Sequence, residues 1–234
     1  MSSKVGLAHE LHPRPTVLSD FILGSQDGLV NVLGILLGLV AAGTATRILD
    51  VAALAALAAE SISMGAVAYT STLARRNLYL SEIERETREM REVPELEREE
   101  VRVILRRWGY QGDEVEEMLG RIEAKPKAWL DLMMAFELNL AEVGPSQPRT
   151  SGLIVLGATI VGSVVPLVPF LLPLPRAVAV VATVVLSAAL LAGIGVYEAK
   201  TTVGSWVASA GRMLLIGLGA GFAGFLVGEL VSRL

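Results

Sequence analysis

The stretch SDFILGSQDGLVNVLGILLGLVAA, residues 19–42, is long and apolar enough to cross a lipid bilayer, yet it contains two acids. A hydrocarbon core about 30 Å thick requires roughly 20 predominantly apolar residues of helix. Asp20 and Asp27 are separated by about two helical turns, so their carboxylates point to nearly the same side. A carboxylate at the bilayer centre costs at least about 2.5–3.5 kcal/mol, so an acid at this depth indicates a function.

The composition separates an apolar body from one charged segment. Of the 234 residues, 53% are hydrophobic and 5% are aromatic, which is typical of a bundle of membrane helices. Residues 75–149 contain 13 basic and 17 acidic side chains, and this excess of four acids equals the net charge of −4. The sequence therefore predicts a membrane body interrupted by a charged insertion.

The residue types that are missing exclude several functions. The chain has no cysteine, and its two histidines, His9 and His12, both lie near the N-terminus, where an ordinary exposed terminus explains them. Disulfides, histidine-based zinc sites, Ser/His/Asp triads and ferritin-like Glu-x-x-His di-iron centres are excluded. No basic patch with interleaved aromatic residues suggests nucleic-acid binding. We therefore expect neither an enzyme nor a bound cofactor.

The apolar segments predict an all-α membrane protein with five transmembrane helices and a three-helix cytoplasmic insertion between the second and third. Asp50 is the expected N-cap of the second helix, which has no proline until Pro94 and so continues into water. Asp113 is the expected cap of the second insertion helix. The expected spans are 19–42, 51–73, 151–172, 176–197 and 205–231, the insertion helices are 95–108, 113–124 and 126–142, and the domains are 1–74, 75–149 and 150–234.

The distribution of Lys and Arg among the loops sets the orientation. The insertion, the N-terminus and Lys200 lie on one side and hold most of the basic residues, so this side faces the cytoplasm. The polar N-terminus lacks the apolar core of a signal peptide, so we expect the first span to be retained. With no targeting signal recognised, we expect a prokaryotic plasma membrane, or a vacuolar membrane in a eukaryote.

The acids within the spans form the first candidate site. Glu60 and Met64 are four residues apart on the second helix and share one face. Together with Asp27 they offer two carboxylates and a thioether, which suit a borderline divalent transition metal. The alternatives are that Asp27 pairs with Arg212 or caps a broken helix through Gly28, and that Met64 is plain packing. Asp20, near the cytoplasmic end, can be explained as a cap.

The acids of the insertion form the second candidate site. Two pairs of glutamates at i,i+3 spacing flank Pro94, and the third insertion helix adds one more carboxylate with methionines near it. Together these residues are typical of an acidic divalent-metal site. Solvated helix faces rich in Glu and Arg are the alternative explanation. Met64 and Glu86 are 22 residues apart, roughly 33 Å of helix, so one ion cannot contact both sites. The candidate residues of the insertion are Glu86, Glu89, Glu97, Glu100, Met133, Met134 and Glu137.

The segments that contain these residues resemble the vacuolar iron transporter family. The resemblance rests on DFILGSQDGLVNVLGILLGLVAA (20–42), AAESISMGAVAYTS (58–71) and WLDLMMAFELNL (129–140), and it covers nearly the whole chain. It implies a dimeric, H⁺-coupled exporter of cytoplasmic Fe²⁺ and related ions such as Mn²⁺. It also implies that Asp27, Met64, Met133 and the insertion glutamates bind metal. Better-studied members have a glutamate where this chain has Ala56, and Glu60 is the expected substitute.

The resulting hypothesis is a homodimeric Fe²⁺/H⁺ antiporter, with Mn²⁺ as a further ion, embedded in a lipid bilayer. The sequence leaves two alternative hypotheses open. One is a membrane-anchored metal-binding or sensing protein that does not transport, in which Asp27 and Glu60 would be dispensable. The other is a structural bundle whose membrane acids are paired with Arg212.

Overall fold

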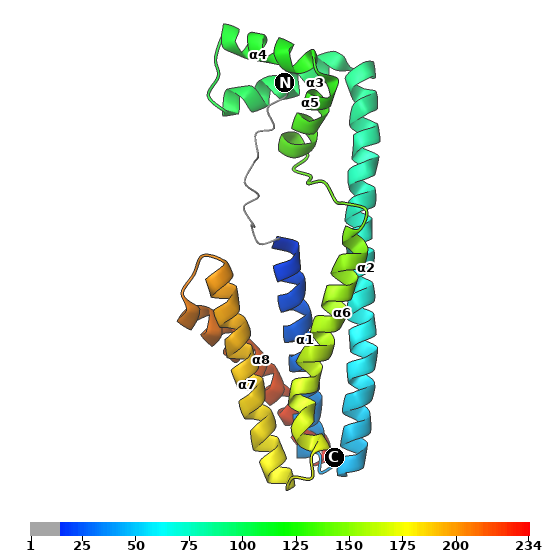
Figure 1. The fold of residues 1–234 in the computed structure, drawn as a ribbon, viewed down its shortest axis with the longest axis vertical. Helices are drawn as coiled ribbons and strands as arrows, with labels where there is room; N and C mark the ends of the chain where they lie inside the picture. The colour runs from blue at the N-terminus through cyan, green and yellow to red at the C-terminus, as the bar shows by residue number, and fades with distance from the viewer. Residues whose placement is uncertain (1–14) are drawn as a thin grey trace, which may run out of the picture. The chain divides into compact units, whose positions relative to one another are not determined.

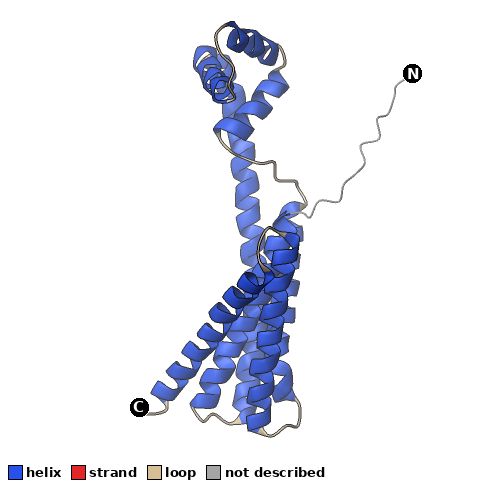
Figure 2. Cartoon of the chain, turned by 90° about the vertical axis from the view of Figure 1, so that its left-hand side faces the viewer, coloured by secondary structure: helices blue, strands red, loops and turns tan. Residues whose placement is uncertain are grey.

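The described part of the chain, residues 15–234 of a computed structural model, consists of helices joined by loops and contains no strand (Figures 1 and 2). The two histidines, His9 and His12, lie outside it. Five of its helices are long and apolar enough to cross a membrane, which confirms the predicted all-α protein with five spans. In chain order the elements are α1 (Pro15–Ala41), α2 (Thr46–Glu92), α3 (Pro94–Arg107), α4 (Asp113–Glu123), α5 (Pro126–Leu132), the π-helix η1 (Met133–Glu137), α6 (Gln147–Leu171), α7 (Arg176–Thr201) and α8 (Trp206–Val231).

The chain forms two compact units. The membrane unit comprises the residues up to Tyr69 together with Arg149–Leu234, and the acidic unit comprises Thr70–Pro148. The helix α2 begins in the first unit and ends in the second, because no proline or glycine interrupts its sequence between Gly65 and Pro94. The five candidate spans are therefore α1, the first part of α2, α6, α7 and α8.

Glycine allows α1 and α8 to pack with their backbones in contact. A Cβ atom on Gly228 would lie 1.9 Å from the carbonyl oxygen of Gly38, and one on Gly224 would lie 2.4 Å from that of Gly34. These contacts explain the small residues of the two helices as packing within one chain. Close packing also joins α1 to α6, where a Cβ on Gly162 would lie 2.1 Å from the Ser25 carbonyl oxygen.

The acidic unit has an apolar core of its own. Val101, Leu105, Val115, Leu119, Trp129 and Met133, from α3, α4, α5 and η1, are each at most 5% exposed. Arg102 joins α3 to α4 through two hydrogen bonds to Glu116, of 2.8 and 3.1 Å. This core fixes α3 and η1 with respect to each other, and both elements supply candidate metal ligands.

Three local predictions were wrong. The helix α2 begins at Thr46, so Asp50 lies within its first turns and is not its cap. Gly112, with φ +54°, takes the N-cap position of α4, and Asp113 is the first helical residue. The third insertion helix ends at Glu137 rather than at 142, because the chain widens into a π turn there and Asn139 adopts a positive φ of 52°.

Candidate functional site

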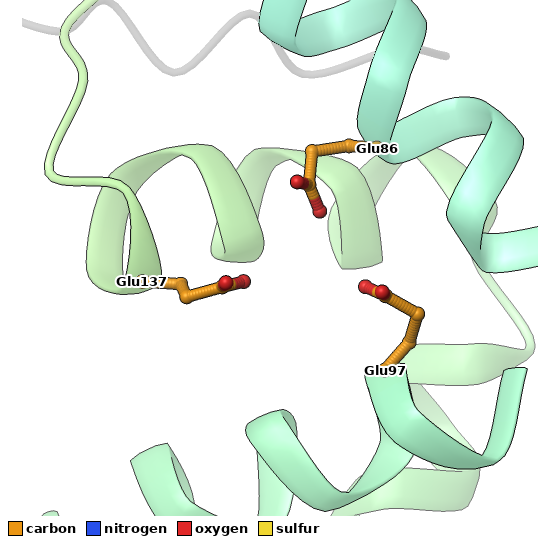
Figure 3. A group of neighbouring side chains, drawn as sticks. All are labelled: Glu86, Glu97 and Glu137. Atoms are coloured by element: carbon orange, nitrogen blue, oxygen red, sulfur yellow. The ribbon is translucent and has the colours of Figure 1, made fainter. Parts of the chain in front are cut away.

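Three glutamates from three elements of the acidic unit converge. Glu86 lies on α2, Glu97 on α3 and Glu137 on η1, and one carboxylate oxygen of each lies within 4.8 Å of the others. Figure 3 shows the three carboxyl groups pointing toward a common centre. All three belong to the set predicted for the insertion site.

Burial makes this cluster costly without a cation or protons. Glu86 and Glu97 are each 2% exposed, and an Oε2 atom of each is buried without a hydrogen-bond partner among the described residues. Ionised carboxylates are almost never buried in this way unless they are paired or bind a metal. The arrangement therefore favours a bound divalent cation over a solvated acidic surface.

Two glutamates of the cluster have a pKa near neutral pH. Burial, followed by the charges of Glu100 and Glu86, raises the pKa of Glu97 to about 7. Burial, followed by the charges of Glu100 and Glu86, raises the pKa of Glu137 to about 7. The Glu137 side chain is exposed as a whole, but its carboxyl group turns into the cluster (Figure 3), which explains why desolvation acts on it. Protons therefore compete with metal near neutral pH.

The two remaining glutamates of the predicted set lie at the edge of the cluster. The charge of the Glu100 carboxyl group, on α3, raises the pKa of Glu137. Glu89, on α2, accepts a 3.1 Å hydrogen bond from Arg85 Nε. Arg85 thus holds one predicted ligand, Glu89, in an ion pair, and it also lies 3.6 Å from Glu82.

The two methionines differ in their surroundings. Met133 is fully buried in the apolar core of the acidic unit, beside Trp129 and Val101. Met134 is 3% exposed and lies outside that core cluster. Both belong to η1, the element that also supplies Glu137. Their roles as sulfur ligands stay predictions.

In the membrane unit, the two deep acids of α1 and α2 meet. Asp27 and Glu60 interact through their carboxyl groups, and both side chains are half-buried. Asp27 also opens onto a hollow of about 260 Å³ lined by α1 residues and by Ile216 of α8. Two carboxyl groups in contact inside an apolar span are stabilised by a cation or a shared proton between them.

The alternative explanations for Asp27 are wrong. Arg212 donates hydrogen bonds of 2.7 and 2.8 Å to the carboxylate of Glu198 and so is engaged elsewhere. The helix α1 continues unbroken through Gly28, so Asp27 caps no helix end. Gly28 instead permits close packing, because a Cβ there would lie 2.4 Å from the Thr159 carbonyl oxygen of α6.

Two further residues were predicted near this pair, Met64 and Asp20. Met64 is half-buried on α2, one turn beyond Glu60, and Asp20 is half-buried near the start of α1. No described contact joins either side chain to the pair. Both assignments stay predictions.

Sequence reasoning missed one residue of the membrane site. Asn31 lies on α1 one turn after Asp27, and its amide Nδ2 donates a hydrogen bond to Glu60 Oε1. The i,i+4 spacing from Asp27 was the available signal, because it places both residues on one face of the helix.

Comparison with known proteins gives one family over almost the whole chain. The VIT family matches residues 18–229. Vacuolar iron transporter 1 from Eucalyptus grandis is 34% identical over 92% of this chain and 87% of its own length. The protein of the same name from Arabidopsis thaliana is 33% identical over 93% and 87%. Protein CCC1 from Saccharomyces cerevisiae is 23% identical over 91% of this chain and 69% of its own length.

Proposed function

Since this chain belongs to the VIT family, we propose that it transports Fe²⁺, with Mn²⁺ as a related ion, out of the cytoplasm in exchange for protons. Its plant relatives are named as iron transporters and not as enzymes, which agrees with the absence of catalytic motifs from the sequence. The chain is a multi-pass membrane protein with five apolar spans.

The observation that carries this proposal is the cluster of Glu86, Glu97 and Glu137, in which the first two residues are buried. The three carboxylates form an all-oxygen ligand set, which Fe²⁺ and Mn²⁺ accept, and Glu86 and Glu97 each have a buried oxygen without a hydrogen-bond partner among the described residues. Glu89, Glu100 and Met133 lie three or four residues from these ligands and complete the set implied by the family resemblance. Met134, three residues before Glu137, is a further candidate ligand. In this account the acidic unit captures the ion from the cytoplasm.

The carboxyl pair of Asp27 and Glu60 is the proposed passage through the membrane unit, with Met64 as a softer ligand one turn along α2. A divalent cation between the two carboxylates neutralises them, and so do protons that replace it. Because both loaded forms lack the full negative charge, either one crosses the low-dielectric interior at less cost than the bare pair. Exchange of metal for protons follows from this chemistry.

We also propose a homodimer in which the second copy covers the face containing the membrane pair. Asn31 is exposed and the hollow beside Asp27 is open, so polar groups would otherwise contact lipid. The natural chain has no cysteine, so a single cysteine at Ile216 provides a clean probe. Disulfide cross-linking of Ile216→Cys in membranes is expected for such an interface, and a strictly monomeric protein would exclude it.

The orientation is proposed on the distribution of basic residues, which places the acidic unit in the cytoplasm. The relatives are named as vacuolar, which gives no support to a prokaryotic plasma membrane. Transport into a vacuole-like compartment would also move the ion out of the cytoplasm.

Anaerobic uptake of radioactive Fe²⁺ into proteoliposomes tests the proposal. The wild type is expected to accumulate iron faster when the compartment receiving the iron is acidic, and Asp27→Ala is expected to abolish uptake. Glu229→Gln is the matched control, because this acid lies at the end of α8 in an exposed pair with Arg233. Equal uptake by wild type and Asp27→Ala would refute the mechanism.

The same experiment separates the proposal from the non-transporting alternative. A metal-binding or sensing protein would bind Fe²⁺ through the acidic unit and leave the vesicles empty. Binding without uptake, in a wild-type protein shown to be folded, would establish that alternative.

A further inference from the structure

The side chain of Asn31 bridges two elements at the membrane pair. It follows Asp27 by one turn of α1, and its amide nitrogen donates to Oε1 of Glu60 on α2. Glu60 also interacts with Asp27, so one carboxyl group of α2 is held by two consecutive turns of α1. The three side chains form a connected unit.

The hydrogen bond from Asn31 leaves one carboxylate oxygen of Glu60 available to bind a metal ion. Oε1 accepts from Asn31, whereas Oε2 is buried and accepts no hydrogen bond from any residue that the structure describes. An ionised carboxylate has about four lone-pair sites, so one amide N–H occupies a small part of them. A free oxygen beside a second carboxylate is what a divalent cation requires.

An amide is suited to this position because it is neutral and does not titrate. A lysine or arginine would hold Glu60 equally well, but it would cancel the negative charge that attracts a cation. The guanidinium group of Arg212, on α8, forms an ion pair with Glu198 and not with Glu60. The amide therefore fixes the carboxylate while its charge stays available to an ion.

We propose that Asn31 is a positioning residue for metal transport, which holds Glu60 so that the carboxylates of Glu60 and Asp27 bind the ion together. This inference rests on the proposed function. Without the amide, Glu60 has no directional restraint from α1, and the ion meets a less organised ligand pair. A hydrogen bond to a charged group contributes enough that its loss corresponds to about a tenfold or greater loss of affinity.

The test is a double-mutant cycle of Fe²⁺ uptake in proteoliposomes, measured over a range of Fe²⁺ concentrations. Asn31→Leu keeps the volume and removes the donor, and it is expected to raise KM about tenfold. In the Glu60→Gln background the same substitution is expected to change KM less than twofold, because the ionised acceptor is absent. Asn31→Gln retains an amide donor and is expected to recover part of the wild-type KM.

The outcomes distinguish failure of the positioning role from failure of the proposed function. A wild-type KM for Asn31→Leu would overturn the positioning role while leaving the proposed function intact. An equal loss in both backgrounds would overturn it too, because a packing effect does not depend on Glu60. If Asn31→Leu fails to fold, as judged by its gel-filtration profile, Asn31→Ala enters the same cycle and is judged by the same criteria. Absence of uptake by the wild type would refute the proposed function itself.

Discussion

Lowering the pH from 7 to 6 should weaken Fe²⁺ binding to the acidic unit by about 30-fold. Glu97 and Glu137 both have a pKa of about 7, and each must lose its proton to bind a metal. For two independent groups, the fraction with both ionised falls from about one quarter to about one part in 120. A carboxylate of ordinary pKa is ionised at both values and would give almost no change.

The measurement is anaerobic calorimetry of the full-length protein with Fe²⁺, in an Asp27→Asn background that removes the membrane pair. Glu97→Gln leaves one group that titrates near pH 7, so the same pH change should then weaken binding only about fivefold. Glu99→Gln is the matched control, because Glu99 lies on the same helix but is exposed and bonded to Arg102. It should keep the full 30-fold dependence. An affinity that changes less than twofold between pH 7 and 6 in the parent would refute the assignment of this cluster.

Three further predictions follow from individual contacts. Arg85→Gln should release Glu89 from its 3.1 Å hydrogen bond and tighten Fe²⁺ binding about two- to fivefold by calorimetry, and weaker binding would contradict this. Gly228→Ala should destabilise the protein by about 1–3 kcal/mol, seen as a lower thermal midpoint, because its Cβ would collide with the Gly38 carbonyl; Gly219→Ala, which meets open space, should have little effect. The metal-free acidic unit should lose stability as the pH rises from 5 to 8. Because the pKa of Glu97 is about 7 in the folded state and 4.5 in the unfolded state, the proton that the folded state retains stabilises it. This stabilisation is complete below pH 4.5 and is lost as the pH rises through 7. A thermal midpoint independent of pH would contradict this.

The spans could be predicted because their lengths and apolar composition are set by the bilayer. Proline and glycine punctuation also located α3 and α4 to within a residue or two, since Pro94 and Gly112 break the helices there. The end of the third insertion helix could not be predicted. Its sequence is helical in pattern up to Glu142, but the chain leaves the helix through a π turn at Met133–Glu137, which depends on packing in the core of the acidic unit.

The sequence predicted the type of site, an acidic metal site, but not which of the candidate residues form it. Spacing on single helices selected Glu86, Glu97 and Glu137, but it gave equal weight to Glu89, which the structure pairs with Arg85. Which acids share a centre depends on how separate helices pack, and a periodic pattern within one helix does not contain that information. Asn31 was overlooked for the same reason, because its partner lies 29 residues away on another helix.

In the proposed mechanism, metal entry is coupled to proton exit through the Asp27–Glu60 pair. A pH-sensitive dye trapped inside proteoliposomes measures it directly when Fe²⁺ is added outside under anaerobic conditions. The internal pH is expected to rise with wild-type protein and to stay constant with Asp27→Ala. Iron entry without any change of internal pH, or an equal rise with both proteins, would contradict the mechanism.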